Sequence, residues 1–492
     1  MALPSTDRDH HAAPARGEFL ALFTAVMLPM FMAAVDQTLL ATATPRIAAD
    51  LGDLTNTSWV AIGYLLAATI TAPLYGRLGD RFGRRNMLMG ALAVFVAGSL
   101  ACAMAISLPM LISARVLQGL GGGGLMVLSQ ALIGELVPPR ERPRYQGYFA
   151  IVFTASSVGG PVIGGFVVNH GDWRWLFWAN VPLGLLAAWR IAALPRSAPS
   201  SHRDAPYDPL GVVLFALSAS SALLWFSLVG HRFAVASSAS LTLAGVAVVG
   251  FALLWRQQRA HPHPFLPLDV ARLPGVRWIC LTVLSFAATM FGLIFLLPIY
   301  LQLGGQGNAA TAGLQLLPLT LGLVVGSTLN GRISSRIGES GRLTPWGLSA
   351  ASLALLALAV LPPTRAGIAI AAAVCGLGFG TVMQTAQVAT QLLAGRERLG
   401  AAAALIALTR STGASLGTAA FGGLAFALLQ APGGGVEGVP LKVDGLAPEH
   451  VQHVFRWVFA ALAVFCAIGV FTSRRAPIVD LRTAPRPLPL EE

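Results

Sequence analysis

One acidic residue, Asp36, lies deep inside a long apolar run, residues 18–44, in the stretch VDQTLL. It is the only Asp or Glu well inside any of the long apolar runs of the chain. Removal from water favours the protonated form of a carboxyl group, so Asp36 could take up and release a proton near neutral pH. The alternative is a structural carboxylate that is hydrogen-bonded to a neighbouring helix. Either interpretation requires a polar partner or a cavity beside Asp36.

A second candidate site lies in the stretch RVLQGLGGGG, residues 115–124. Arg115 does not readily lose its charge, so it would tune a carboxylate rather than carry a proton itself. Gln118, about one helical turn further along, could share the same polar network. Because Arg115 lies near one end of its apolar run, the alternative is a side chain that extends to the membrane–water boundary. Gly119 and Gly123 indicate close helix packing.

Other polar side chains also lie within the apolar runs, where each could line a pathway or form hydrogen bonds between helices. Gln315 and Asn330 belong to this group. The candidates that we assign to pathway lining are Gln302, Gln384, Gln387 and Arg410. Arg410 is the first to examine, because an unpaired arginine inside an apolar segment needs a partner or a route to water.

No group of residues predicts a metal site or an enzyme. The histidines of HPHP, residues 261–264, are separated by proline and have no other ligand near them. Asp36 has no second carboxylate at its depth, and the sequence shows neither a catalytic His or Ser arrangement nor a phosphate-binding loop for ATP. The four cysteines, isolated in apolar runs, are Cys102, Cys280, Cys375 and Cys466. We therefore predict no metal, no cofactor and no enzymatic activity.

The composition explains why polar residues are so few. The chain has 492 residues, of which 55% are hydrophobic and only 11% charged, and its mean hydropathy is +0.69. Soluble proteins average about 25% charged residues, so the deficit indicates a surface that faces lipid, where a charge is costly. The net charge of +12 does not indicate nucleic-acid binding, because the basic residues recur in short islands between apolar runs.

The apolar runs predict an all-α integral membrane protein. A spanning helix needs roughly 20 mainly apolar residues, and by that measure the chain contains about fourteen spans. The expected spans are residues 18–44, 57–76, 87–106, 109–133, 145–168, 175–194, 209–230, 236–255, 276–302, 311–331, 343–361, 366–390, 400–429 and 453–473.

The arginines predict the orientation in the membrane, because positively charged loops stay in the cytoplasm. With the N-terminus inside, 25 basic residues fall on the cytoplasmic side and five on the outer side. Those on the outer side, apart from Arg456 near a boundary, are Arg46, Arg174, Arg232, Arg365 and Lys442. A miscount of one span would destroy this asymmetry. We therefore expect an even number of spans, with both termini cytoplasmic, in a bacterial inner membrane.

The chain also repeats itself at a nearly constant offset. GRLGDRFG at 76 is echoed by GRISSRIG at 331, GLGGGGLMV at 119 by GLGFGTVMQ at 376, and SSVGGPVIGG at 156 by GASLGTAAFGG at 413. Three matches in the same order predict two parallel six-helix halves with a site between them. The predicted parts are a cytoplasmic tail (1–17), a first half (18–194), cytoplasmic linkers with an inserted helix pair (195–275), a second half (276–473) and a cytoplasmic tail (474–492).

The most charged stretch is GRLGDRFGRRN, residues 76–86. Its arginines fix the topology, and its glycines allow a short loop to turn sharply. Asp80 can bridge the arginines and can also bind the N-terminus of a helix from the other half. Such contacts exist only when the cytoplasmic side is closed. GRISSRIG has Ser335 or its neighbouring serine where Asp80 would be, so we expect a one-sided gate. The residues that we assign to this cytoplasmic gate, which would favour the outward-facing state, are Gly76, Asp80, Arg81, Gly83, Arg84 and Arg85.

Several patches resemble the major facilitator superfamily, most closely its fourteen-span branch of drug:proton antiporters, which includes bacterial multidrug exporters. These patches are VDQTLLATATPRIAADLG, GRLGDRFGRRNML, RVLQGLGGGG, GGPVIGG and DWRWLFWANVPLG, and the likeness covers nearly the whole chain. The resemblance implies a role for Asp36 in proton coupling or in binding cationic drugs. It also implies a role for Arg115 in proton coupling, and it implies the cytoplasmic gate.

The stretch GGPVIGG, residues 159–165, lies in the fifth expected span. Gly160, Gly164 and Gly165 leave one helix face without side chains, and Pro161 bends the helix. The echo LGTAAFGG lacks the proline, so the predicted kink belongs to the first half alone. The resemblance associates this pattern with antiporters rather than symporters.

We therefore predict a proton-coupled antiporter that exports small amphipathic or cationic compounds, such as drugs or antibiotics, by alternating access. Two alternatives stay open: a narrow-substrate exporter of a metabolite such as an antibiotic, an amino acid or a siderophore, and a sensor or scaffold that has lost transport. The expected energy source is the proton gradient. The expected partners of this monomer are a small-molecule substrate, protons and the lipid bilayer, and the sequence leaves periplasmic adaptor proteins open.

Overall fold

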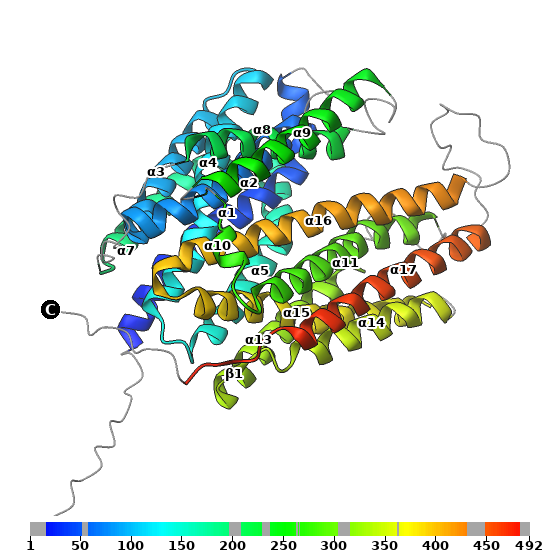
Figure 1. Ribbon diagram of the computed structural model, residues 1–492. Coiled ribbons are helices and arrows are strands. Elements are labelled where there is room, and N and C mark those ends of the chain that lie inside the picture. Colours follow the sequence, from blue (N-terminus) through cyan, green and yellow to red (C-terminus); the bar gives the residue numbers. More distant parts are fainter. Residues whose placement is uncertain are drawn as a thin grey trace, which may run out of the picture.

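The computed structural model describes residues 16–51, 58–195, 208–228, 237–261, 264, 266–303, 315–361, 364–430 and 448–482. Nearly all of these residues are α-helical (Figure 1). Most of the predicted tail 1–17, the tail residues 483–492 and the linker at 196–207 lie outside the described residues.

The helices form two bundles with a helix pair between them in sequence. The N-terminal bundle comprises α1 (Arg16–Leu51), α2 (Ser58–Phe82), α3 (Arg84–Ala103), α4 (Leu108–Leu136), α5 (Arg142–His170), α6 (Trp175–Trp178) and α7 (Asn180–Ala192). The inserted elements are α8 (Pro209–Leu228), α9 (Ser238–Ala260) and the short α10 (Leu268–Ala271). The C-terminal bundle comprises α11 (Val276–Leu303), α13 (Leu317–Ile337), β1 (Glu339–Ser340), α14 (Thr344–Val360), α15 (Arg365–Ala394), η1 (Arg396–Arg398), α16 (Leu399–Gln430), α17 (Pro448–Arg475) and β2 (Val479–Asp480).

Local sequence signals set several helix ends. The Oγ of Ser107 accepts the backbone N–H of Met110 at 3.4 Å and so begins α4. Thr364 does the same for α15 by accepting the N–H of Gly367 at 3.1 Å. These side chains satisfy amides that have no partner inside the helix. Gly338 ends α13 with φ at 81°, a conformation that glycine adopts without strain.

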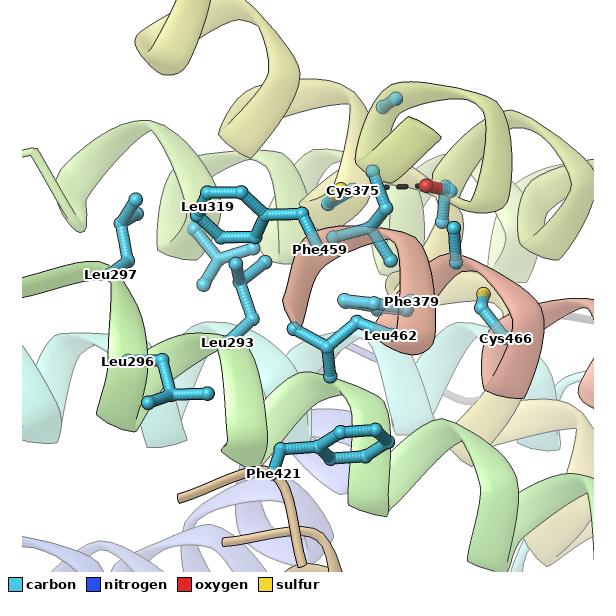
Figure 2. Packing of buried hydrophobic residues seen from close by; sticks show 14 of the residues in the cluster. Leu293, Leu296, Leu297, Leu319, Cys375, Phe379, Phe421, Phe459, Leu462 and Cys466 are labelled. Atoms are coloured by element: carbon cyan, nitrogen blue, oxygen red, sulfur yellow. Dashed lines mark hydrogen bonds between the residues drawn. The ribbon is translucent and has the colours of Figure 1, made fainter. Parts of the chain in front are cut away.

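Each bundle has its own apolar core. In the C-terminal bundle, side chains from α11, α13, α15, α16 and α17 meet in one cluster (Figure 2). Phe286 of α11 meets Phe379 of α15 edge to face, with ring centroids 5.6 Å apart, and Cys375 lies in this core as a free thiol. A separate cluster in the N-terminal bundle surrounds Phe95 and Leu125. Each bundle therefore has a core of its own, and a smaller cluster joins α4 to α16.

The inserted helices α8 and α9 pack on each other beside the seam between the bundles. Asp208, just before α8, accepts a hydrogen bond from Nε2 of Gln258 at the end of α9, at 2.7 Å. Phe215 of α8 belongs to a small apolar cluster that includes Ile70 of α2 and Leu408 of α16. The inserted pair thus contacts one helix from each bundle.

The observed helices follow the expected spans closely. Within the described residues, ten helices are long and apolar enough to cross a membrane, and α8 and α14 are shorter apolar helices. Two expected spans differ from this pattern. The run 175–194 is divided into α6 and α7 at Ala179. The run 311–331 overlaps α13, whose last part carries Arg332 and Arg336. The structure therefore shows a multi-pass helical protein, and a total near fourteen spans stays a prediction.

The bundles meet at one end of the molecule. There α2 and α4 contact α16, and α5 contacts α13 and α15; in Figure 1, α16 (orange) runs between α2 and α11. Gly76 and Gly400 approach so closely that a Cβ atom on Gly76 would lie 2.6 Å from the carbonyl oxygen of Gly400. We call this the arginine-rich end, because it holds Arg84, Arg140, Arg142 and Arg396.

The C-terminal segment fastens the end of α13, and β1 pairs antiparallel with β2. The N–H of Leu481 donates to the carbonyl oxygen of Gly338 at 2.8 Å. Nη2 of Arg482 donates to the carbonyl oxygen of Ile337 at 2.6 Å. Residues 479–482 therefore supply partners for carbonyl groups at a helix end, which have none inside the helix.

The close packing of α13 on α15 can be tested with Gly376→Ala. A Cβ atom at Gly376 would lie 2.8 Å from the backbone nitrogen of Leu323, so the helices must separate. We expect a loss of about 1–3 kcal/mol in the free energy of unfolding, seen as a lower thermal unfolding temperature in detergent. Gly423→Ala is the matched control, because a Cβ atom there meets nothing within 4 Å. Equal unfolding temperatures for both variants and the wild type would contradict the packing.

Candidate functional site

The predicted residues Asp36, Arg115 and Gln118 lie together in the N-terminal bundle. A guanidinium nitrogen of Arg115 pairs with Oδ2 of Asp36, which joins α4 to α1. Nε2 of Gln118 donates to Oδ1 of Asp36 at 2.8 Å, and Arg115 donates to Oε1 of Gln118 at 2.5 Å. Their exposed fractions are 3%, 1% and 0%. Asp36 is therefore a fully buried carboxylate with a fully buried counter-charge.

Two residues that the sequence analysis did not select complete this network. Ser99 of α3 accepts hydrogen bonds from Gln118 at 2.9 Å and from Asn180 of α7 at 2.8 Å. The Asn180 amide also lies 3.4 Å from Oδ1 of Asp36. Neither residue is charged, so neither stands out in an apolar run; the only sequence signal was the position of Asn180 in DWRWLFWANVPLG. The network connects α1, α3, α4 and α7.

Arg115 lies inside the bundle rather than at the membrane boundary. Its guanidinium carbon lies 4.3 Å from the ring centre of Tyr64 and 5.9 Å from that of Phe177. Its Nε donates to the carbonyl oxygen of Val60 at 3.2 Å. Cation–π contacts and hydrogen bonds to the charge compensate for the loss of water around a buried arginine. The alternative of a side chain that extends to the boundary is therefore wrong for this state.

A cavity of about 110 Å³ reaches the network from one side. It lies between α1 and α2, and its lining residues are Gln37, Leu40, Thr44, Ala61, Tyr64, Leu65 and Arg115. At about 30 Å³ per water molecule it could hold a few waters, whereas pockets that bind drug-sized ligands measure about 300–1,000 Å³. This cavity suits water and protons rather than a bulky compound.

Asp80 caps a helix of the other bundle. Its two carboxylate oxygens each accept a backbone N–H at 2.8 Å, one from Gly400 and one from Ala401, in the first turn of α16. Arg84 donates to Asp80 at 2.7 Å, to Glu135 at 3.0 Å and to a backbone carbonyl of η1 at 2.8 Å. A carboxylate at a helix N-terminus is stabilised by unpaired amides and by the helix dipole. The charges of the loop therefore hold the two bundles together.

The other residues assigned to the gate have different contacts. Gly83 has φ at 91°, a left-handed conformation that separates α2 from α3 and suits glycine. Arg85 donates to the carbonyl oxygens of Ile191 and Ala192 at 3.0 and 2.6 Å, within its own bundle. The guanidinium of Arg81 lies over a neighbouring ring, 5.1 Å from its centre.

A second, more exposed contact joins the bundles through the segment before α11. Asp269 of α10 pairs with Arg77 of α2 at 3.0 Å and with Arg398 of η1 at 3.5 Å. The side chains of Arg77 and Asp269 are 31% and 34% exposed, compared with 8% and 12% for Arg84 and Asp80. Half-exposed ion pairs contribute little, about 0–1 kcal/mol. Sequence patterning gave no signal for Asp269.

The seam between α5 and α13 closes without a buried carboxylate. Nε of Arg140 donates to the carbonyl oxygen of Ser335, the sequence counterpart of Asp80, at 3.2 Å. A Cβ atom on Gly331 would lie 2.5 Å from the carbonyl oxygen of Pro143. The two seams are therefore unequal: a charged cap holds one, and close backbone packing holds the other.

Buried glutamines of α15 also lie at the arginine-rich end. Gln384 donates to Ser327 of α13, and Gln391 donates to the carbonyl oxygen of Gln130 on α4 at 3.0 Å. Gln387 lies between them on the same helix face and is 1% exposed. Neither its amide nitrogen nor its oxygen has a hydrogen-bond partner among the described residues. This costs free energy in the closed arrangement.

The remaining predicted residues fall in three places. Gly160 packs against Thr38 of α1, where a Cβ atom would lie 2.9 Å from the Thr38 Cβ. Pro161 and Gly164 lie within α5, although the side chain of Pro161 is outside the described set, and Gly165 faces open space.

Gln302 is exposed and donates to Pro298 in its own helix at 3.2 Å, so the structure gives it no pathway contact. Arg410 lies inside α16.

The two helical bundles meet at one end, and one of them holds a buried ion pair; this is the architecture of a multi-pass membrane transporter. A model of the Major Facilitator Superfamily matches residues 26–418. The chain belongs to this family, whose members are transporters rather than enzymes.

The proteins of similar sequence are also named as transporters. An uncharacterized MFS-type transporter of Mycobacterium tuberculosis is 34% identical over 411 residues, which are 82% of this chain and 59% of that protein, so the chain spans about 59% of this relative's length. The multidrug transporter protein MdtP of Bacillus subtilis is 30% identical over 404 residues, 82% of this chain and 74% of MdtP. The transporter YebQ of Escherichia coli is 34% identical over 428 residues, 85% of this chain and 91% of YebQ.

Solved structures share the fold. The proton:xylose symporter XylE superposes with a TM-score of 0.64 at 14% sequence identity, covering 95% of this chain and 98% of XylE. The human organic anion transporter MFSD10 gives a TM-score of 0.62 at 12% identity, covering 94% of this chain and 100% of MFSD10.

The contribution of the Asp80 cap can be measured with Asp80→Asn. A cysteine at Ala131, buried between α4 and α16, would report opening of the arginine-rich end in a protein whose native cysteines are replaced by alanine. The carboxamide has one accepting oxygen instead of two and lacks the charge that Arg84 and the helix dipole stabilise, a loss of about 1–2 kcal/mol, so labelling should become roughly tenfold faster. Asp269→Asn is the control and should change the rate less than about fivefold. Equal rates for the two variants would contradict the assignment.

The unpaired amide of Gln387 predicts the opposite effect. Gln387→Leu removes two buried polar atoms that have no described partner, so the closed end should be stabilised by about 1–3 kcal/mol. Labelling of the cysteine at position 131 should then slow. Gln302→Leu, at an exposed site on α11, should leave the rate unchanged. Faster labelling of Gln387→Leu would show that its amide is satisfied in the closed state.

Proposed function

We propose that the chain is a proton-coupled antiporter of the fourteen-span drug-export branch. It exports small amphipathic compounds across the bacterial inner membrane, with the arginine-rich end and both termini in the cytoplasm. The observation that carries the proposal is the pair between Asp36 and Arg115, the most deeply buried ion pair among the described residues, with side chains 3% and 1% exposed. Multidrug transporters among the similar proteins support the substrate class.

The pair supports proton coupling through its chemistry. Arg115 keeps its charge, so only Asp36 can change protonation state. Protonation removes the ion pair and weakens the hydrogen bond from Gln118, which loosens α4 from α1. The cavity beside Arg115 gives water a route to the site. The proton gradient thus supplies the energy, and no cofactor takes part.

The conformation supports alternating access. The described contacts between the bundles gather at the arginine-rich end, where Asp80 caps α16. With that end in the cytoplasm, this is the outward-facing arrangement. The moving parts are the halves 18–194 and 276–473. Rocking them apart breaks the cap, exposes the glutamines of α15 to water and opens the cytoplasmic side, so substrate can enter there.

The ion pair also limits how well the site around Asp36 can bind cationic compounds. Arg115 already neutralises Asp36 in this state, so a cationic compound reaches that carboxylate only after Arg115 moves away. The buried and complete network argues against a transport-inactive scaffold, because an unused buried ion pair is costly to keep.

Asp36→Asn tests proton coupling. In inverted vesicles with an imposed pH gradient, the variant should lose uphill efflux by roughly tenfold or more, because a carboxamide cannot carry the proton. It should keep downhill exchange of the same compound. A compound panel in an efflux-deficient bacterium, with a protonophore control, supplies the substrate.

Asp172→Asn is the matched control, because Asp172 is an exposed acid that pairs with nearby Arg174. It should transport like the wild type. Unchanged proton-driven efflux in Asp36→Asn would show that another group carries the proton.

A further inference from the structure

Arg410 is an arginine within a membrane-spanning helix, far from either end of that helix. It lies 11 residues after the start of α16, or about 16 Å along the helix. Among the described residues, none forms a hydrogen bond or an ion pair with its side chain. The side chain is half-buried. Arginine does not lose its proton in proteins, so this charge persists and requires water or an anion.

The helix face that carries Arg410 is the face that meets the N-terminal bundle. Ala403 of α16 packs with Val127 and Ala131 of α4 in one apolar cluster, and Ala407 borders that cluster. Ala403 and Arg410 are seven residues apart, so they point within about 20° of each other. Arg410 therefore continues this contact face by two turns, away from the arginine-rich end.

The matching face of α4 is uncovered at that level. Val116, Leu120, Val127 and Ala131 are spaced four, seven and four residues apart, so they share one side of α4. Val127 and Ala131 are 2% and 0% exposed, whereas Leu120 and Val116 are 37% and 39% exposed. The two helices therefore touch near the arginine-rich end and part beyond it, between the bundles.

Lipid does not account for Arg410. Leu408 faces the inserted helix α8, and Gly413 and Gly417 face α11, where Cβ atoms would meet the backbone of Leu284 and Ala288. The direction of Arg410 lies between the α4 contact and the α11 contact. It thus points toward the space between the bundles.

We propose that Arg410 binds an anionic group, a carboxylate or a sulfonate, on the transported compound. A guanidinium forms paired hydrogen bonds with such groups, and no described carboxylate competes for this one. Asp36, the buried acid of the other bundle, is already held by Arg115. The unpartnered charge facing the pathway is therefore positive, which selects acidic amphipathic compounds. This inference rests on the proposed transport function and specifies its substrate class.

A matched probe series tests the charge preference. Dansylglycine carries a carboxylate, dansylglycinamide is its neutral analogue, and N-(2-aminoethyl)dansylamide carries a cation. Binding to the full chain in phosphatidylcholine nanodiscs is measured by dansyl fluorescence. We expect dansylglycine to bind about tenfold more tightly than the amide, as befits a hydrogen bond to a charged group. Equal affinities, or a preference for the cation, would overturn the proposal.

Variants of Arg410 test whether this residue causes the preference for the carboxylate probe. Arg410→Gln should bind dansylglycine and dansylglycinamide equally. Arg332→Gln, at an exposed arginine of α13, is the control and should keep the wild-type preference. Should the glutamine variant fail to fold, Arg410→Lys keeps the charge but not the paired geometry. It should weaken dansylglycine binding by about threefold or more and leave the amide unaffected. Retention of the full preference in either variant would reject Arg410 as the anion site.

The two proposals fail in different ways. Binding of dansylglycine through Arg410 without proton-driven transport would contradict the antiporter function but not the anion site. Proton-driven export that depends on Asp36 without any preference for acidic probes would contradict the anion site alone.

Discussion

The ion pair between Asp36 and Arg115 is the interaction on which the N-terminal bundle depends. Each charge alone would be very unfavourable inside a bundle that excludes water, so each helix requires the other's charged residue. The neutral partners Gln118, Ser99 and Asn180 complete the hydrogen bonds that the pair leaves unfilled. Four helices thereby gain one common polar centre in an otherwise apolar bundle. Protonation of Asp36 would therefore change the contacts of all four helices.

The polar contacts between the bundles, unlike the buried ion pair, join side chains of one bundle to backbone groups of the other. Asp80 meets the free amides of α16, Arg84 meets a carbonyl of η1, and glycines let the chains approach. A small apolar cluster, with Val127 and Ala131 of α4 against Ala403 of α16, adds to these contacts, so opening exposes this cluster but neither of the two bundle cores. Each bundle keeps its own apolar cluster, which explains how one could move against the other as a rigid body. The buried amide of Gln387, which has no hydrogen-bond partner among the described residues, destabilises the closed arrangement. This lowers the free energy needed to open the arginine-rich end.

Much of the fold could be predicted from the sequence, because each apolar run is local and long enough to form a helix. The interruption at Ala179 could not, because the run 175–194 is apolar on both sides of it. At the site, Asp36 and Arg115 stood out because charge is rare in such runs. Ser99 and Asn180 did not, since a neutral polar residue carries no such signal. The sequence predicted that Asp80 meets the N-terminus of a helix from the other half, but only the tertiary packing identifies its partners, the backbone amides 320 and 321 residues away.

Residues 479–482 support the second half at the place where the first half carries the loop with Asp80. The second copy of this motif, GRISSRIG, keeps the two outer glycines and both arginines of GRLGDRFG but has Ser335 at the position of Asp80. The end of α13 is instead held by the chain that follows α17. The corresponding positions of the two halves are therefore held by different parts of the chain: a side chain that meets the opposite bundle in the first half, and the C-terminal segment of the same bundle in the second.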